Sequence, residues 1–464
     1  MKEENEKEEI KREDASPVSS PAVGNPYENA IEQPVKKKTK KQRVSACLTA
    51  VFIALGSFLA GAFVNYLTLD NQMRTLLKLK NRIQKSYYEE VSDDEFYDVL
   101  FDAVSDNLLD EYSWYLSGDE YKQSQQQAEG KQSGLGLVFS TGQAGIEQMR
   151  VVRVCGNSPA EAANIVAGEY IVGFGASETE LAEGLYFDDF SAFLEDYDAG
   201  ERFVLKVRSL TGETRVISLA KSDYVENYVF YRTNTTAYRF IGEDALTPTA
   251  KGEPLDCLDD RTAYIRLTQF NGAAAAEFDG AMQLFAEQGK KNLVLDLRGN
   301  GGGYLDIMLK VARYFCKSAT GDKPIVAVAD YGEKSESFAA SGNYYSRYFD
   351  ENSRITVLAD NQTASASECL IGCMLDYGAI AYTDICLAER DGVAKTYGKG
   401  IMQTTYPLAG FNGDAVKLTT ARICWPVSKK CIHGVGVLPT DGAFTVSENP
   451  NAEAELIAAI ALLY

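Results

Sequence analysis

The stretch NLVLDLRGNGGG, from Asn292 to Gly303, decides the fold. Its first part, Asn292–Leu297, is an apolar run of strand length, and the glycines that follow are typical of a tight turn. A second apolar run, Thr262–Leu267 (TAYIRL), lies upstream, and a helical pattern over Ala273–Gln288 separates the two. This order of strand, helix and strand predicts an α/β fold with a layered sheet covered by helices.

A second strand and turn of the same kind lie further along the chain. Ile355–Ala359 (ITVLA) reads as a buried strand, Asn361–Glu368 (NQTASASE) as a turn, and Ala366–Tyr377 as the helix that the turn opens. A turn that opens a helix presents unpaired backbone N–H groups and the positive end of the helix dipole, where an oxyanion can be stabilised. Phosphate binding is the alternative, but the glycine turn has neither a P-loop lysine nor the dinucleotide-binding glycine spacing.

The second turn carries the hydroxyl groups of Thr363, Ser365 and Ser367. A serine in this position is often only a helix cap, but it can act as a nucleophile if a base reaches it. Downstream, TYGKGIMQ places Lys399 between glycines and Gln403 four residues later. A lysine base must be neutral, so the pKa of Lys399 must fall by about 3 units from about 10.4, which requires burial. Gln403 could then hold the amine without adding charge.

Composition excludes several other functions. The chain has 464 residues, 45% of them hydrophobic, and a net charge of −20, which disfavours a general nucleic-acid binder. It contains one histidine and no paired CxxC motif among nine cysteines, so neither a multi-histidine metal site nor a zinc knuckle is expected. His433 is the rival base, but it lies in a glycine-bounded turn with no carboxylate nearer than Asp441, which favours an ordinary turn histidine.

The amino end predicts a membrane anchor. Residues 1–43 are charged, contain four prolines and have almost no large apolar side chains, which indicates a disordered tail ending in a basic cluster. Residues 44–69 follow with 26 positions and no charge, more than the ~20 needed for a transmembrane helix. A cleaved signal peptide usually has a shorter apolar part. The basic cluster should stay in the cytoplasm, so residues 70–464 are expected on the outer face.

Beyond this segment we expect three parts: helical residues 70–130, a β module at 131–222, and an α/β core at 223–464. The predicted β strands of the module are separated by Gly, Asn and Ser. They are Leu135–Phe139, Gln148–Val154, Tyr170–Phe174, Phe203–Arg208 and Arg215–Leu219. Short helices are predicted at Ser158–Ile165 and Phe187–Asp196.

The β module resembles a PDZ domain. GLGL, which is Gly134, Leu135, Gly136 and Leu137, is similar to a carboxylate-binding loop, and NSPAEAANIVAGEYIVGFG matches a stretch common in such domains. Backbone N–H groups of the loop could hold a terminal carboxylate, while a strand edge accepts the peptide as an added strand. Asn164 and Glu169 depart from the usual Gly and Asp. A module that only orients the next domain is the alternative.

Taken together, the motifs resemble the carboxyl-terminal processing peptidases, or tail-specific proteases. The resemblance covers about residues 75–464 and rests on motifs that occur in the order of that family. They are LLDEYSWYLSGDEY, TAYIRLTQF, LVLDLRGNGGG, TASASE, YGKGIMQ, AVKLTTAR and HGVGVLPTDG. The resemblance implies a serine–lysine endopeptidase with a core of the ClpP/crotonase type, a PDZ domain that recognises substrate C termini, and no metal or organic cofactor.

The resemblance also implies roles for residues of this chain. Ser365 would be the nucleophile, Lys399 its base and Gln403 the residue that positions the amine. The oxyanion hole would be formed by the backbone N–H groups of Gly303 and Ala366. The 34-residue separation of Ser365 and Lys399 is longer than is usual in the family.

Because of that long separation, Lys395 becomes a rival base, although only Lys399 has glycine on both sides.

We expect a single-pass membrane enzyme that cleaves protein substrates with free C termini and binds no nucleic acid. Its N-terminal helices could support a homo-oligomer. A catalytically inactive PDZ scaffold is the alternative from another class. A crotonase-like acyl-transfer enzyme is a third, but it gives no reason for the PDZ-like module.

Overall fold

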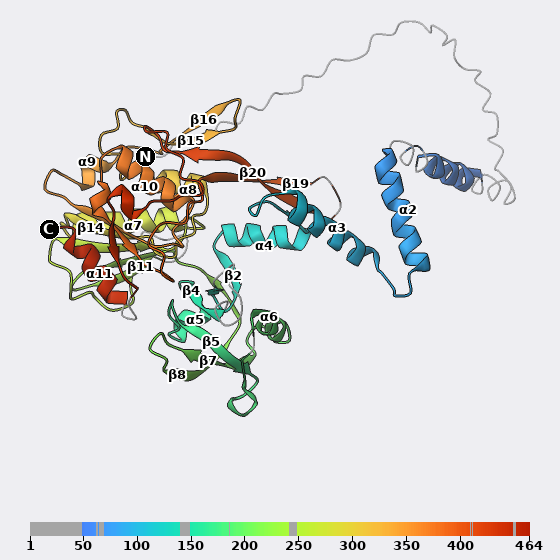
Figure 1. The fold of residues 1–464 in the computed structure, drawn as a ribbon, viewed down its shortest axis with the longest axis horizontal. Helices are drawn as coiled ribbons and strands as arrows, with labels where there is room; N and C mark the ends of the chain where they lie inside the picture. The colour runs from blue at the N-terminus through green and yellow to red at the C-terminus, as the bar shows by residue number, and fades with distance from the viewer. Residues whose placement is uncertain are drawn as a thin grey trace, which may run out of the picture. The chain divides into compact units, whose positions relative to one another are not determined.

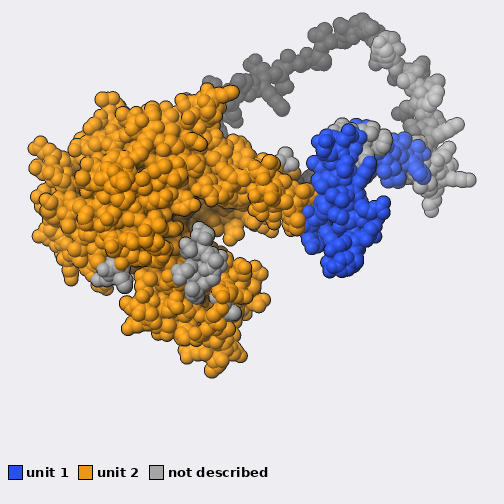
Figure 2. All heavy atoms as spheres, viewed as in Figure 1, with its two compact units in different colours: residues 1–96 blue, residues 97–464 orange. Residues whose placement is uncertain are grey.

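The computed structural model describes residues 49–61, 64, 69–139, 149–184, 186–240, 248–408, 410, 412–448 and 452–464. The chain divides into two compact units, Met1–Phe96 and Tyr97–Tyr464, which are coloured separately in Figure 2. The tail predicted at 1–43 lies outside the described residues. The boundaries predicted at residues 130/131 and 222/223 fall inside the second unit and stay predictions.

In the first unit, residues 49–61 are helical, and most of the rest of the predicted anchor lies outside the described residues. No helix in the described part is long and apolar enough to span a bilayer. Helix α2 (Asn71–Ser86) begins after Asp70, whose carboxylate accepts the N–H of Met73 at 2.7 Å. Two further helices, α3 (Asp93–Leu108) and α4 (Gly118–Ala128), lie within the segment predicted at 70–130, whose bounds stay a prediction.

The β module has its own hydrophobic core. The five strands and two helices predicted for it are present with shifted ends, apart from residues 140–148, which are not described. Three short strands, Lys131–Gly134, Ala182–Glu183 and Ser222–Val225, are not predicted by the sequence. The elements of the module are β2 (Lys131–Gly134), β3 (Leu137–Phe139), β4 (Val151–Val154), α5 (Pro159–Ala162), β5 (Tyr170–Gly175), β6 (Ala182–Glu183), α6 (Phe187–Glu195), β7 (Arg202–Arg208), β8 (Thr214–Ala220) and β9 (Ser222–Val225). Strands β2 and β9 pair, so the module begins and ends at one place. Phe174, Phe190 and Phe203 pack at its centre.

An eight-stranded sheet forms the centre of the core (Figure 1). Its order is β12 (Pro248–Ala250), β11 (Ala237–Phe240), β10 (Val229–Arg232), β13 (Thr262–Leu267), β14 (Asn292–Asp296), β17 (Ile355–Ala359), β18 (Ile385–Ala388) and β21 (Phe444–Val446). The five strands from β13 to β21 are parallel, and the other three are antiparallel. The two central strands predicted from sequence, β13 and β14, are therefore confirmed as neighbours.

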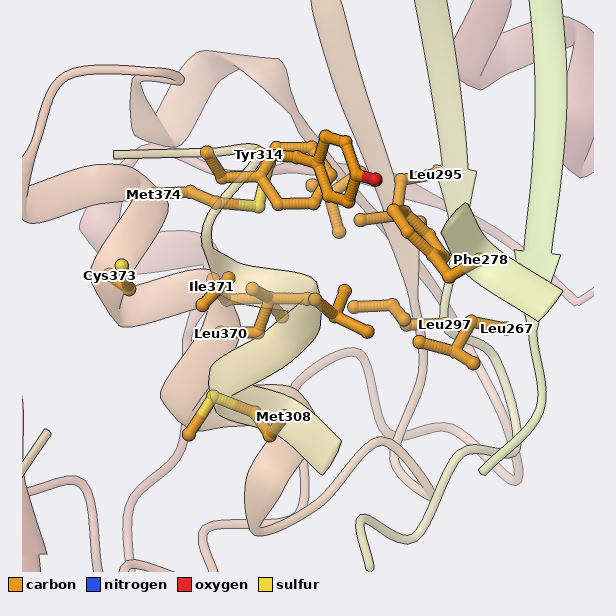
Figure 3. Packing of buried hydrophobic residues seen from close by; sticks show 14 of the residues in the cluster. Leu267, Phe278, Leu295, Leu297, Met308, Tyr314, Leu370, Ile371, Cys373 and Met374 are labelled. Carbon is orange, nitrogen blue, oxygen red and sulfur yellow. The ribbon is translucent and has the colours of Figure 1, made fainter. Parts of the chain in front are cut away.

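Helices cover both faces of this sheet. Because side chains alternate along a strand, Leu293 and Leu295 of β14 join one apolar cluster while Val294 joins another. The first cluster includes side chains of α7 (Ala274–Glu287), α8 (Leu305–Ala312) and α10 (Ala366–Asp376), as Figure 3 shows for Phe278, Met308 and Leu370. The second includes side chains of α11 (Ala452–Ala461). The layered α/β prediction is confirmed.

A smaller sheet lies beside the predicted lysine base. It consists of β1 (Trp114–Leu116), β15 (Ile325–Asp330), β16 (Ser335–Ala339), β19 (Ile401–Pro407) and β20 (Ala415–Cys424). Strand β19 begins two residues after Lys399 and pairs along one edge of β20, while β1 and β15 pair with the two ends of the other edge. A short helix, α9 (Tyr345–Tyr348), completes the core.

Candidate active site

Ser365 stands at the start of α10 in a strained conformation, with φ 55° and ψ −114°. Its hydroxyl makes no capping hydrogen bond to the helix. The neighbouring hydroxyls are engaged: Thr363 Oγ1 donates to the Leu297 carbonyl at 2.8 Å, and Ser367 Oγ donates to the Asn300 carbonyl at 3.0 Å. Of the three hydroxyls predicted in this turn, Ser365 Oγ is thus the one left without a partner among the described residues.

The glycine turn packs directly against Ser365. The Ala364 N–H donates to the Asn300 carbonyl at 2.9 Å, which ties the two predicted turns together. A Cβ placed on Gly302 would stand 2.8 Å from Ser365 Cβ and 2.9 Å from Ala366 N. Within the described part of the chain, the N–H groups of Gly303 and Ala366 donate to no other group. The two amides assigned to an oxyanion hole are therefore free and belong to adjoining turns.

We expect Gly302→Ala to lower kcat/KM by at least about 100-fold, because one lost oxyanion contact alone costs that much. The added methyl group must displace the turn or Ser365, and Gly302 has φ +102°, which alanine rarely adopts. Gly301→Ala is the matched control, since its Cβ would meet nothing within 4 Å. Equal activity of the two variants in a peptide-cleavage assay would contradict the close packing of this turn against Ser365.

A buried carboxylate joins the serine turn to the lysine loop. Glu368 is fully buried, and its Oε2 accepts the backbone N–H groups of Ser365 at 3.0 Å and Lys399 at 2.9 Å. Its Oε1 accepts from Thr396 Oγ1 at 2.6 Å and from the Gly398 N–H at 2.8 Å. Burial raises the pKa of Glu368, and the four donors act in the opposite direction. The backbones of Ser365 and Lys399 are thereby held beside one oxygen atom.

The Lys399 amine is half-buried beside a group that sequence reasoning did not single out. Its Nζ lies 5.0 Å from the centroid of the Tyr112 ring, an arrangement typical of a cation–π contact. Burial, reinforced by the nearby positive charge of Lys417, lowers the pKa of Lys399 to about 8, against the opposing charges of Asp110 and Glu111. Burial thus acts on Lys399 in the direction that a neutral lysine base requires.

Gln403 lies in β19 but is not bound to the amine. Its Nε2 donates to the backbone carbonyl of Tyr112. Among the described residues, no hydrogen bond joins Lys399 Nζ to Ser365 Oγ or to Gln403. Tyr112 therefore contacts both predicted partners of the serine. Tyr112 belongs to the motif LLDEYSWYLSGDEY, which contributes to the family resemblance, but that resemblance implies no role for the tyrosine.

The rival bases have other surroundings. Lys395 Nζ donates to the Val435 carbonyl at 3.3 Å. The His433 ring lies edge-on to Tyr112, with centroids 6.2 Å apart, and its Nδ1 has no partner in the described part of the chain. Asp441 contacts Lys430 at 3.3 Å and the Leu438 N–H at 2.9 Å.

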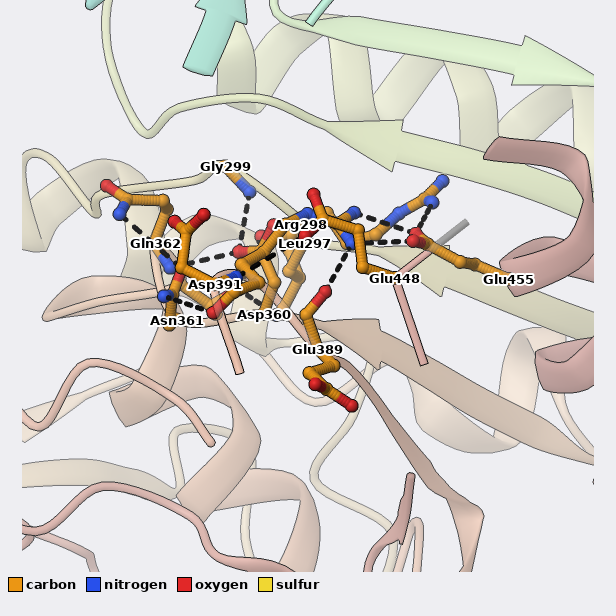
Figure 4. A network of polar contacts seen from close by, with 12 residues as sticks. Leu297, Arg298, Gly299, Asp360, Asn361, Gln362, Glu389, Asp391, Glu448 and Glu455 are labelled. Carbon is orange, nitrogen blue, oxygen red and sulfur yellow. Dashed lines mark hydrogen bonds and ion pairs between the residues drawn. The ribbon is translucent and has the colours of Figure 1, made fainter. Parts of the chain in front are cut away.

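A buried polar network holds the glycine turn and the serine turn together (Figure 4). Asp360 accepts the N–H groups of Gly299 at 3.0 Å and Gln362 at 3.1 Å, so one carboxylate holds both turns. Arg298 pairs with Asp296 at 2.6 Å and with Glu455 at 2.5 Å. Burial alone would raise the pKa of Asp296, but the Arg298 guanidinium lowers it to about 2. Among the described residues, no group of three or more His, Cys, Asp or Glu side chains could hold a metal ion.

Comparisons with known proteins agree with this geometry. The model of peptidase family S41 matches residues 261–441, which contain both turns and Lys399. A chloroplastic C-terminal processing peptidase of Tetradesmus obliquus is 28% identical over 343 residues, covering 73% of this chain and 67% of the relative. A carboxyl-terminal-processing protease of Picosynechococcus sp. is 26% identical over 348 residues, covering 74% and 73%. A photosystem II D1 C-terminal processing protease of known structure is 22% identical, with a TM-score of 0.49, covering 82% and 94%.

Residues 261–441 of the chain thus match peptidase family S41, a family of serine peptidases. The named relatives place the chain with the C-terminal processing proteases, as its motifs indicated.

Proposed function

We propose that the protein is an endopeptidase in which Ser365 attacks the substrate carbonyl and Lys399 is the general base. The observation that carries the proposal is the Glu368 carboxylate, which holds the backbones of both residues at hydrogen-bond distance. The hydroxyl is free and the amine has a lowered pKa, which suits a nucleophile and its base. For the reaction, Lys399 Nζ turns from the Tyr112 ring towards Ser365 Oγ.

The steps follow from these roles. Lys399 takes the Ser365 proton as Oγ attacks the scissile carbonyl, and the N–H groups of Gly303 and Ala366 bind the oxyanion. The protonated amine gives its proton to the leaving nitrogen, and an acyl-enzyme remains on Oγ. Water, deprotonated by Lys399, then releases the acyl group. Gln403 positions the amine by accepting one of its N–H groups through Oε1, while its Nε2 continues to donate to the Tyr112 carbonyl.

The pH dependence of hydrolysis should follow the titration of Lys399. Because the neutral amine is the base, we expect kcat/KM to rise about tenfold per pH unit below the pKa of about 8 and to level off above it. Lys417→Met removes a positive charge that lowers the pKa of Lys399, so the rising limb should move to higher pH. The measurement is kcat/KM on a short peptide from pH 6 to 10. A profile that is flat across pH 8 would contradict a lysine base.

We further propose that the β module binds the C-terminal tail of the substrate. A solvent-open groove of about 820 Å³ is lined by Leu135, Gly136, Leu137, Phe139 and Phe190, among others. The Leu135 carbonyl accepts the Ala160 N–H, and the Gly136 carbonyl accepts the Cys155 N–H. The N–H groups of Leu135 and Gly136 themselves have no partner among the described residues. Strand β3 pairs with β4 on one edge, and no described residue pairs with its other edge, which could accept an added strand.

A carboxylate-binding groove makes cleavage depend on the end of the substrate. We expect an unstructured protein ending in an apolar residue with a free carboxylate to be cleaved at least about tenfold faster than its C-terminal amide, because a charged hydrogen-bond acceptor is lost. A substrate with a charged last residue should also be slow, since the lining is apolar. Cleavage rates that do not depend on the terminus would contradict tail recognition and leave the Ser365 mechanism untouched.

We also propose that the chain is anchored in the cell membrane by residues 44–69, with the protease on the outer face. The support is the uncharged segment itself and the basic cluster that precedes it.

A further inference from the structure

Asn271 lies between β13 and α7, outside the groups assigned above. Its side chain is 9% exposed, and its Oδ1 has no hydrogen-bond partner within the described part of the chain. A buried acceptor left without a donor is unfavourable, so such an atom in a native fold calls for an explanation. In the sequence, this residue directly follows the TAYIRLTQF motif.

Asn271 lies against the glycine turn. Phe270 donates its N–H to the Gly302 carbonyl at 2.9 Å and accepts the Tyr304 N–H at 2.8 Å, so the two segments pair around Gly303. A Cβ on Gly303 would stand 2.6 Å from Asn271 Oδ1. The unpartnered acceptor is therefore next to the amide that the proposed function places in the oxyanion hole.

Asn271 also lines the groove of the β module. The cavity lined by Leu135 and Gly136 is also lined by Gln269 and Asn271 of the core. The segment is held in place by its neighbours, because the Gly272 N–H donates to the Ala128 carbonyl at 2.8 Å and the Ala274 N–H donates to the Asn271 carbonyl at 3.0 Å. Asn271 therefore borders both the groove of the β module and the glycine turn beside Ser365.

We propose that Asn271 Oδ1 accepts the backbone N–H of the substrate residue whose carbonyl is attacked. In an extended chain the N–H and C=O of one residue point to the same side, as in the residue pairs of antiparallel strands that are joined by two hydrogen bonds. A donor at Gly303 for the carbonyl and an acceptor beside it for the N–H match that pattern. The ligand is a peptide backbone, so Asn271 fixes the register of the scissile bond without selecting a side chain.

This inference rests on the proposed function, and a substrate lacking the one N–H tests it. Asn271→Leu removes the acceptor at similar size, and Asn271→Asp keeps an acceptor at the same place. The substrates are a peptide and its depsipeptide, in which an ester oxygen replaces that N–H. We expect Asn271→Leu to cleave the all-amide peptide at least about tenfold more slowly than the wild-type protein does. On the depsipeptide, the variant and the wild-type protein should have equal rates. Asn271→Asp should retain most of the activity on the all-amide peptide.

The same experiment separates the possible failures. Asn352→Leu, on the exposed turn before β17, is the control and should cleave both substrates normally. Equal slowing of both substrates by Asn271→Leu would show a merely structural role and overturn the inference, as would an unchanged rate on the all-amide peptide. Ser365→Ala is run beside them: if it still cleaves, the proposed mechanism fails, and if it is inactive while no coupling is found, only the role of Asn271 fails.

Discussion

Replacing Ser365 by alanine is expected to lower kcat/KM by about 10⁴-fold or more, to the residual rate that binding and the oxyanion hole provide without a nucleophile. The hydroxyl accepts and donates no hydrogen bond to the described residues, so its loss should leave the melting temperature unchanged or raise it. The assay is the cleavage of an unstructured protein followed by mass spectrometry of the products, together with thermal unfolding of both proteins.

Two serines serve as comparisons for that variant. Ser337→Ala, on the exposed strand β16, should behave as wild type. Ser367→Ala removes a hydrogen bond to Asn300 and should cost about 1 kcal/mol of stability while keeping substantial activity. Cleavage by Ser365→Ala at the wild-type rate would remove the mechanism, and inactive Ser367→Ala with active Ser365→Ala would transfer the role to the other hydroxyl.

Lys399→Met is expected to reduce kcat/KM by about 10³- to 10⁴-fold at every pH and to abolish the rise through pH 8. Methionine keeps most of the apolar stem that packs beside Tyr112, so the loss should come from the amine. Because serine and lysine act as one unit, the double variant with Ser365→Ala should be no slower than Ser365→Ala alone.

Lys395→Met is the matched control for the lysine. Its amine contacts the Val435 carbonyl on the surface, so the variant should retain its activity and its pH profile. If Lys395→Met were inactive and Lys399→Met active, the base would be the lysine four residues earlier in the chain, and the proposed assignment would be wrong.

The sequence predicts the sheet better than the contacts of the site. Strands β13, β14 and β17 are mostly apolar on both faces, so their pattern indicates burial. The buried polar exceptions are Thr262, Asn292, Asp296 and Thr356. The glycine turn is equally visible, because Gly302 has to have φ +102° and admits no Cβ beside Ser365. These features are local, and local patterns are what a sequence displays.

The contacts of Lys399 and Gln403 depend on tertiary structure and could not be foreseen. Tyr112 lies 287 positions before Lys399 in the chain, and β1 brings it there by pairing with β20. Nor does the sequence tell that Glu368 accepts from four groups, since an acidic residue in a first helical turn is usually a cap on the surface. The free acceptor of Asn271 is likewise a property of packing.

The central claim is that Ser365 forms the acyl-enzyme, and trapping that intermediate tests it most directly. The wild-type protein is mixed with a peptide substrate above pH 8, quenched in acid within the first turnover and digested for mass spectrometry. The account predicts an added acyl mass on the peptide that contains Ser365, at that residue. Steady turnover with no covalent adduct, or an adduct on another residue, would contradict it.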